Sequence, residues 1–306
     1  MSKPTIVIGS PLVIGSRGSA LALWQARHIA AALEALGAQP RLEIIKTTGD
    51  KITDVPLANV GGKGLFTKEI EEALLAGTID LAVHSLKDVP TGLPAGLVLA
   101  AFPPREDPRD AWIGKPLSEM KTGDRVGTSS LRRSAQLHAL NRGFTIENLR
   151  GNVDTRLRKL DEGHYDAVVL AAAGLNRLGW GDRIQQLLDP SIMCPAVGQG
   201  ALAIETRDDG GAGQLFAAKL DHAPTRARVL AERSLLATLE GGCQVPIGAY
   251  ATVEGTTLHL RAVVASPDGS RIIRDELRGD DPIELGEKLG HQLLDAGAGE
   301  ILREDR

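Results

Sequence analysis

The chain has 306 residues, of which 42% are hydrophobic and 3% are aromatic, and it carries a formal net charge of −4 at pH 7. This length suits two or three domains, and the apolar content is sufficient for hydrophobic cores. A general nucleic-acid binder is disfavoured, because such proteins are usually basic and the single-strand binders stack bases on aromatic rings.

The first third of the chain alternates expected strands with expected helices. The expected strands are residues 12–15, 41–46 and 79–84, and the expected helices are residues 20–36 and about 66–75. This alternation indicates an α/β sheet. Residues 47–64 form a long, polar, glycine-rich stretch, which we interpret as a mobile lid, with a plain surface loop as the alternative.

A second α/β unit follows the proline-rich residues 102–108. Its expected strands are residues 125–127, 145–149 and 166–171, and its expected helices are residues 131–140 and 153–160. Residues 193–200 resemble a second hinge, and the strand 201–205 comes after it. The two crossovers indicate that the chain leaves its first domain and later returns to it.

The last part of the sequence has a different pattern. Helices are expected at residues 225–239 and 282–294, and strands at residues 247–253, 257–264 and 271–277. Short turns join these strands, which predicts antiparallel hairpins. We therefore expect domain 1 at residues 1–103 and 201–220, domain 2 at residues 104–200, and a small α+β domain 3 at residues 221–306.

A strand–turn–helix pattern with an adjacent arginine occurs three times, at residues 15–19, 127–133 and 150–156. The N-terminus of a helix offers unpaired N–H groups and a partial positive charge, and arginine adds a planar fork that suits carboxylates. Ordinary helix capping beside solvated arginines is the alternative at any one turn. The three turns together predict a crevice for a ligand with several negative charges.

Familiar nucleotide and metal motifs do not fit the sequence. Residues 61–64 lack the spacing of a P-loop, and the G-x-G-x-x-A match at residues 198–203 precedes a strand instead of a helix. The seven histidines are scattered, so we expect no metal site. No signal peptide and no run of 18 apolar residues is found, so we expect a cytoplasmic protein without a membrane partner.

Two single residues are candidates for chemistry. Asp88 follows the strand 79–84 beside Lys87 and His84, where it is the best candidate for acid–base work, with a structural turn aspartate as the alternative. Cys243 lies in a glycine-rich turn, where a thiolate can form a covalent link, although many lone cysteines are buried and inert. We interpret the other cysteine, Cys194, as structural.

The ordered set of motifs resembles the porphobilinogen deaminase (hydroxymethylbilane synthase) family over nearly the whole chain. The motifs are GSRGSALA at 15–22, GGKGLF at 61–66, HSLKDVP at 84–90, GTSSLRR at 127–133, RGNVDTR at 150–156, PAVGQG at 195–200 and GC at 242–243. The resemblance implies an α/β protein with two periplasmic-binding-protein-like domains and a central cleft. It also implies a small C-terminal α+β domain with a three-stranded antiparallel sheet.

The resemblance further implies a monomeric transferase of tetrapyrrole and haem biosynthesis. Four porphobilinogen molecules would be condensed into hydroxymethylbilane with release of ammonia, on a dipyrromethane cofactor held by a thioether to Cys243. Asp88 would be catalytic. The remaining site residues would be Ser85, Lys87, Thr128, Ser129, Ser130, Arg132, Arg133 and Gln199 for the cofactor, Arg17, Ser19, Arg150, Arg156 and Arg177 for the substrate, and Lys63 and Phe66 in the mobile loop.

The main alternative is a non-enzymatic anion-binding protein, or a regulator, built on the periplasmic-binding fold. It explains the arginines but leaves Cys243 and Asp88 without a role. Consumption of porphobilinogen that depends on Asp88 would separate the two readings.

Overall fold

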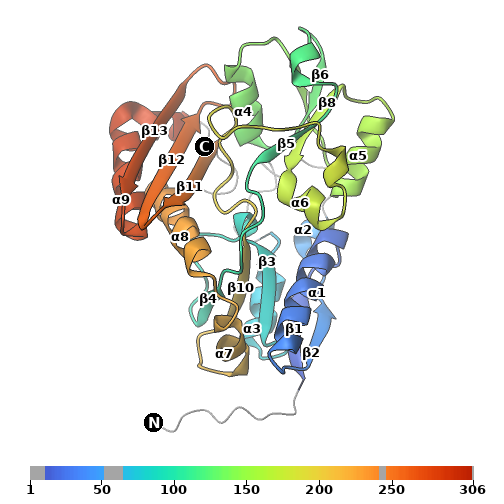
Figure 1. Cartoon of the computed structure of the whole chain (residues 1–306), viewed down its shortest axis with the longest axis vertical. Coiled ribbons are helices and arrows are strands. Elements are labelled where there is room, and N and C mark those ends of the chain that lie inside the picture. The colour runs from blue at the N-terminus through green and yellow to red at the C-terminus, as the bar shows by residue number, and fades with distance from the viewer. Residues whose placement is uncertain (1–10, 52–64, 241–245, 305–306) are drawn as a thin grey trace. The chain divides into compact units, whose positions relative to one another are not determined.

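The computed structural model describes residues 11–51, 65–240 and 246–304 (Figure 1). Two compact units divide the chain. The first comprises the described parts of residues 1–105 and 201–226, and the second comprises those of residues 106–200 and 227–306. In the described ranges no helix has the length and apolar character needed to cross a membrane.

The first unit is built on a five-stranded sheet with the order β2-β1-β3-β10-β4. Its strands are β1 (Leu12–Ser16), β2 (Pro40–Ile44), β3 (Leu81–Ser85), β4 (Leu97–Ala101) and β10 (Leu202–Arg207). β1 runs parallel to β2 and β3, whereas β10 is antiparallel to β3 and β4. The segments that follow β1 and β3 therefore leave the sheet at the same edge, which positions the site described below.

Three longer helices belong to this sheet: α1 (Ala20–Ala35), α3 (Lys68–Leu75) and α7 (Ala212–Ala218). Ser19 caps α1 by accepting a hydrogen bond from the backbone N–H of Ala22 at 3.3 Å. Gly37, at φ +85°, follows the end of the helix in the left-handed conformation that favours glycine. α1 buries Ile29 and Leu33 in the apolar core of the sheet.

The second unit repeats the arrangement with the sheet order β7-β6-β8-β5-β9. Its strands are β5 (Asp110–Gly114), β6 (Arg125–Gly127), β7 (Thr145–Glu147), β8 (Ala167–Ala171) and β9 (Gln186–Leu187), and its helices are α4 (Leu131–Ala139), α5 (Val153–Asp161) and α6 (Ala172–Arg177). β6 is parallel to β7 and β8, and β5 is antiparallel to β8 and β9. In each sheet the fourth strand, β10 or β5, is the one that enters from a crossover.

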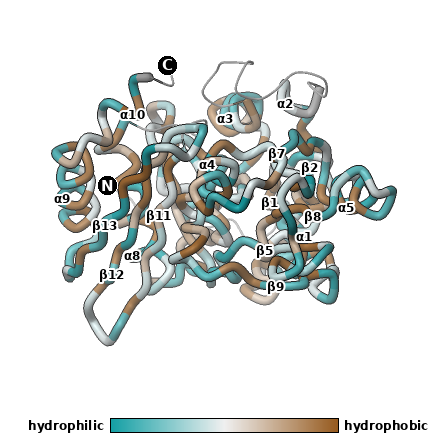
Figure 2. Tube along the Cα trace, turned by 90° about the horizontal axis from the view of Figure 1, so that it is seen from above, coloured by the Kyte–Doolittle hydropathy of each residue, from teal (hydrophilic) through white to brown (hydrophobic). Residues whose placement is uncertain are grey.

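The C-terminal part contains α8 (Ala223–Thr238), the strands β11 (Ile247–Glu254), β12 (Thr257–Ala265) and β13 (Ile272–Gly279), and the helices α9 (Pro282–Leu293) and α10 (Gly299–Glu304). The strands form an antiparallel sheet in sequence order. A core that includes Leu235, Leu260 and Leu289 joins this sheet to α8 and α9. Figure 2 shows hydrophobic and hydrophilic segments alternating around α9, as expected for a helix with one buried face.

The predicted α/β fold class is confirmed: the chain forms two five-stranded mixed sheets with matching strand orders and a three-stranded antiparallel sheet. The expectation of a loop throughout residues 47–64 was wrong at its start, where α2 (Thr48–Lys51) forms one helical turn. The rest of that stretch lies outside the described residues. The sequence reading missed β4, β5, β9, α6 and α7. The three-domain boundaries stay a prediction.

Candidate functional site

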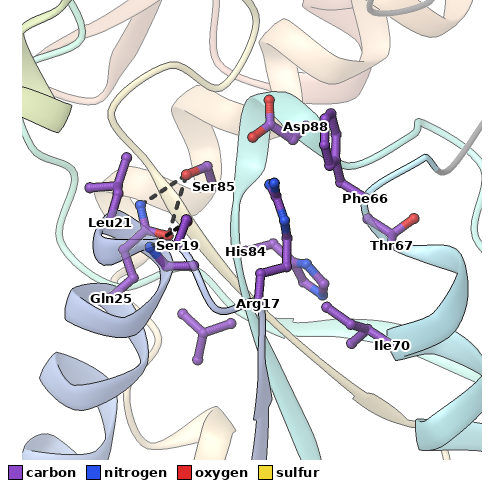
Figure 3. A pocket seen from close by; sticks show the side chains of 12 residues that line it. Arg17, Ser19, Leu21, Gln25, Phe66, Thr67, Ile70, His84, Ser85 and Asp88 are labelled. Carbon is purple, nitrogen blue, oxygen red and sulfur yellow. Dashed lines mark hydrogen bonds between the residues drawn. The ribbon is translucent and has the colours of Figure 1, made fainter. Parts of the chain in front are cut away.

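A pocket of the first unit gathers five of the predicted site residues (Figure 3). Arg17 and Ser19 come from the turn after β1, Ser85 and Asp88 come from the end of β3 and the single turn of 3₁₀-helix η2 (Leu86–Asp88), and Phe66 precedes α3. The parallel pairing of β1 with β3 brings these separate segments together. The turn after β1 and the end of β3 therefore meet at one pocket.

Arg17 provides the positive charge of this pocket. Its guanidinium carbon lies 4.1 Å from the centre of the Phe66 ring, within the range of a cation–π contact. Phe66 also packs close to α2, because a Cβ added at Gly49 would meet its ring. Backbone contacts tie the two segments, with Gly49 N–H donating to the Leu65 carbonyl at 2.9 Å. The Phe66 ring thus contacts both Arg17 and α2.

Two polar side chains of the pocket are held by their neighbours. The Ser19 hydroxyl caps α1, as ordinary capping predicts. Gln25 of α1 is buried and donates from Nε2 to the Ser85 hydroxyl at 2.9 Å. The sequence reading missed Gln25, although a polar residue four positions before Ile29, on the buried face of α1, was an available signal.

Asp88 is exposed at the end of η2, whereas Lys87 beside it is half-buried. Leu86 anchors this turn in the core, and its N–H donates to the Ala201 carbonyl at 3.0 Å. The carboxylate of Asp88 therefore reaches the pocket from a fixed piece of backbone. It can accept N–H hydrogen bonds there and stabilise a nearby cation.

In the second unit, Arg132 and Arg133 of α4 both bind the buried carboxylate of Asp110. Arg132 donates from Nη1 to Oδ2 at 2.8 Å and also to the Cys194 carbonyl at 2.6 Å. Arg133 donates from Nε and Nη2 to Oδ1 at 2.9 and 2.7 Å. Gln199 adds a bond from Nε2 to Oδ1 at 2.9 Å. Four predicted or newly found polar groups thus form one buried cluster.

Burial alone would raise the pKa of Asp110, but the guanidinium groups of Arg132 and Arg133 outweigh it and hold that pKa well below its usual range. Asp110 is therefore ionised, and its single negative charge faces the two positive charges of Arg132 and Arg133. The Nε of Arg132 is buried and has no hydrogen-bond partner among the described residues. The sequence reading missed Asp110, because it begins β5, a strand that was not predicted.

The hydroxyl groups of the second turn cap α4 and shape its start. Ser130 accepts a hydrogen bond from Arg133 N–H at 3.4 Å, and the Thr128 hydroxyl accepts one from Ser130 N–H at 3.2 Å. Ser129 is exposed. The capping alternative therefore describes Thr128 and Ser130 in this structure, and a ligand at this turn would meet the exposed Ser129 and the backbone of the helix N-terminus.

The turns after β6, β7 and β8 leave the second sheet at one edge, because these strands are parallel. Arg150 lies in the turn after β7, and Arg156 lies in the first turn of α5. The Nη2 of Arg150 is buried without a hydrogen-bond partner in the described structure. Arg156 donates from Nε to the Gly151 carbonyl at 2.7 Å. Arg177, in α6 after β8, is buried and donates to the Gly200 carbonyl at 2.7 Å, and burial lowers its pKa to about 10.

Cys243 and Lys63 lie outside the described residues. Cys194 is buried, and burial raises the pKa of its thiol to about 12. A thiol with such a pKa is not ionised near neutral pH and is a poor nucleophile. This agrees with the interpretation of Cys194 as structural.

Two family models match consecutive ranges of the chain. The family described as "Porphobilinogen deaminase, dipyromethane cofactor binding domain" matches residues 12–213, and "Porphobilinogen deaminase, C-terminal domain" matches residues 226–295. Relatives named porphobilinogen deaminase include those of Syntrophobacter fumaroxidans and Trichlorobacter lovleyi, each 54% identical, and that of Brevibacillus brevis, 50% identical. The alignments cover 95%, 96% and 95% of this chain, respectively, and 96% of each relative. The chain therefore belongs to the porphobilinogen deaminase family.

Proposed function

We propose that this chain condenses four porphobilinogen molecules stepwise into the linear tetrapyrrole hydroxymethylbilane, with release of ammonia, on a covalently attached dipyrromethane. The observation that carries the proposal is the pocket in which the cation of Arg17 and the carboxylate of Asp88 face one ligand space. Porphobilinogen brings two carboxylates, a pyrrole N–H and an aminomethyl group. Arg17 suits the carboxylates, and Asp88 suits the pyrrole N–H.

The chemistry of deamination assigns Asp88 its role. When the aminomethyl C–N bond breaks, the electron pair leaves with nitrogen and positive charge develops on the pyrrole and its methylene carbon. A fixed carboxylate stabilises that charge as it forms, and its effect grows when the ligand excludes water from the pocket. Asp88 is therefore the proposed catalytic residue.

The described residues fit a dipyrromethane with four carboxylate arms. The Asp110 cluster has one more guanidinium group than carboxylates, and the buried Nε of Arg132 has a hydrogen-bonding capacity that no described residue meets. Such a cluster favours an added anion. When bound, the cofactor supplies the first acceptor pyrrole. We propose that Cys243 attaches it and that the following residues hold it: Ser85, Lys87, Thr128, Ser129, Ser130, Arg132, Arg133 and Gln199.

The remaining arginines extend the same logic to the substrate and the lengthening polyanion. We propose that Arg17, Ser19, Arg150, Arg156 and Arg177 bind the substrate carboxylates, and that Lys63 and Phe66 belong to a loop over the site. The orphan Nη2 of Arg150 supports its assignment. We also propose the three-domain division stated above. We further propose that the protein works in the cytoplasm as a monomer without nucleic acid. Size-exclusion chromatography with light scattering tests whether it is a monomer.

The deciding experiment is the intact mass of the purified protein beside the variants Cys243→Ser and Cys194→Ala, before and after incubation with porphobilinogen. We expect a mass excess of one dipyrromethane in the wild type and in Cys194→Ala, and none in Cys243→Ser. Release of ammonia from porphobilinogen should accompany the excess. If the wild type shows no mass excess, before or after incubation, and releases no ammonia, the anion-binding alternative replaces this proposal.

A further inference from the structure

Beneath the pocket lies a buried cluster of titratable side chains that the proposed function does not use. His84, on β3, lines the pocket, and its Nε2 is 3.0 Å from Oε2 of Glu205 on β10. Their side chains are 5% and 0% exposed, so the pair is sealed from bulk water on the side of Glu205. Glu71 of α3 is also buried close to them.

Within this cluster, Glu71 favours its protonated form. Burial raises the pKa of Glu71, and the charge of Glu205 adds to the rise, while the His84 ring opposes it. Glu71 therefore lies where its neutral, protonated form is favoured. Oε1 of Glu205 is buried without a hydrogen-bond partner in the described parts of the chain, which leaves that oxygen for a mobile proton or water.

The pair also fixes the histidine ring. With Nε2 bonded to Glu205, the ring nitrogen that remains to accept a proton is Nδ1. The charged groups that share the pocket or the cluster with His84 are Arg17, Asp88, Glu71 and Glu205. Only two titratable groups of the described residues line the pocket besides Arg17, namely His84 and Asp88.

The proposed reaction has two steps in which a titratable side chain of the pocket can act. After the C–N bond breaks and ammonia leaves with the electron pair, the α-carbon of an acceptor pyrrole forms the new C–C bond to the methylene carbon. The α C–H bond of that acceptor must then break, its electrons restoring the aromatic ring and its proton passing to a base. Summed over one addition, ammonia takes up the proton, so no oxidant, reductant or co-reactant is required.

We propose that His84 is the base that removes this α-proton, and that Glu205 is the positioning residue that orients its ring. In this scheme Asp88 stabilises the cation that develops as the C–N bond breaks. His84 acts afterwards, when it removes the α-proton and restores the neutral pyrrole. This division of labour rests on the proposed function and goes beyond it, because it assigns the second half of each addition to a different residue.

The variant His84→Gln separates the proton role from a structural one. A glutamine amide reaches the position of Nε2 and keeps a hydrogen bond to Glu205, but it cannot take up a proton. We expect kcat to fall roughly 10²-fold or more, with the cofactor mass retained. Porphobilinogen deuterated at its free α-carbon should then show a primary isotope effect on kcat that the wild type lacks. The matched control is His222→Gln, a half-buried histidine of the same unit bonded to Thr225, which should keep the wild-type kcat.

Two further measurements keep the inference testable if His84→Gln does not fold. Glu205→Gln keeps the shape of the pair and should also lower kcat with an α-deuterium effect. In the wild-type protein labelled with ¹⁵N-histidine, NMR should find the proton of the His84 ring on Nε2 at the pH of maximal rate. A ring protonated on Nδ1 there, or His84→Gln at the wild-type rate without an isotope effect, overturns this inference. A wild type that does not consume porphobilinogen contradicts the proposed function instead.

Discussion

Arg133 donates two hydrogen bonds to the same oxygen of Asp110, from Nε at 2.9 Å and from Nη2 at 2.7 Å. The acceptor is fully buried, and Arg132 binds its other oxygen. Two consecutive residues of one helix thus converge on one carboxylate from a strand 22 positions earlier. This contact links the start of α4 to β5 and sets the charge of the proposed cofactor site.

Asp110→Asn should strongly destabilise the protein. The substitution leaves two buried guanidinium groups without a counter-charge, and breaking a buried pair in this way costs about 3–5 kcal/mol. We expect the free energy of unfolding in urea to fall by about that amount. Asp161→Asn is the control, because Asp161 pairs with Arg183 on the surface and the loss of such a pair costs about 0–1 kcal/mol. Equal losses in the two variants would contradict the assigned importance of burial.

The same residue predicts how stability depends on pH. The pKa of Asp110 is lowered in the folded state, so its contribution is complete above the unfolded carboxyl pKa of about 4 and is lost as the pH falls below that value. The free energy of unfolding should therefore decline towards acid more steeply in the wild type than in Asp110→Asn. Urea unfolding at a series of acidic pH values tests this. Parallel curves would show that Asp110 titrates alike in both states.

Much of the fold could be read from local patterns. The Ser19 cap and the terminal Gly37 bound α1 because capping and left-handed glycine are short-range effects. The turns around Gly255 and Gly269 predicted the hairpins of the C-terminal sheet, because turn preferences are also short-range effects. β5 was missed because it begins with a charged residue, Asp110. Burying that charge is favourable only when the fold brings Arg132 and Arg133 beside it, which no local pattern reveals.

The candidate site shows the same limit. Motif order predicted Arg17, Ser85 and Asp88, and the parallel pairing of β1 with β3 brought them together. Glu205 could not be predicted as a partner of His84, because their contact depends on the antiparallel register that places Ala203 opposite His84. Sequence patterns identify which residues carry chemistry, whereas strand register decides which of them meet.

Replacing Asp88 should remove activity without harming the fold. Asp88 is exposed, so Asp88→Ala should leave the free energy of unfolding within about 0.5 kcal/mol of the wild type. Loss of the carboxylate that stabilises the developing cation should lower kcat by roughly 10²- to 10⁴-fold. Asp182→Ala is the matched control, because Asp182 is also exposed in a three-residue 3₁₀-helix, residues Gly181–Arg183. Normal product formation by Asp88→Ala would remove its assigned role.

The cation–π contact of Arg17 should matter for substrate affinity. Phe66→Leu removes the ring over which the guanidinium lies, a contact that contributes about 1 kcal/mol. If the ring holds Arg17 ready for a carboxylate, KM for porphobilinogen should rise about 5-fold by that energy, with the cofactor mass unchanged. Phe216→Leu is the control, since Lys219 lies over that ring 5.0 Å from its centre, outside the pocket. A lower KM in Phe66→Leu would mean that stacking withdraws Arg17 from the substrate.

Gly200 should tolerate no side chain. Its φ is +85°, and an added Cβ would clash with the Glu106 carbonyl oxygen. Gly200→Ala therefore adds a backbone clash to the cost of the left-handed conformation, together about 3 kcal/mol. Gly163→Ala, at φ +76° with nothing within 4 Å, carries only the conformational cost of about 1 kcal/mol. Because Gly200 also accepts a hydrogen bond from Arg177 and follows Gln199 of the Asp110 cluster, Gly200→Ala should reduce cofactor loading as well as stability. Urea unfolding and intact mass measure the two effects, and equal unfolding energies for the two alanine variants would show that the backbone beside Glu106 moves aside.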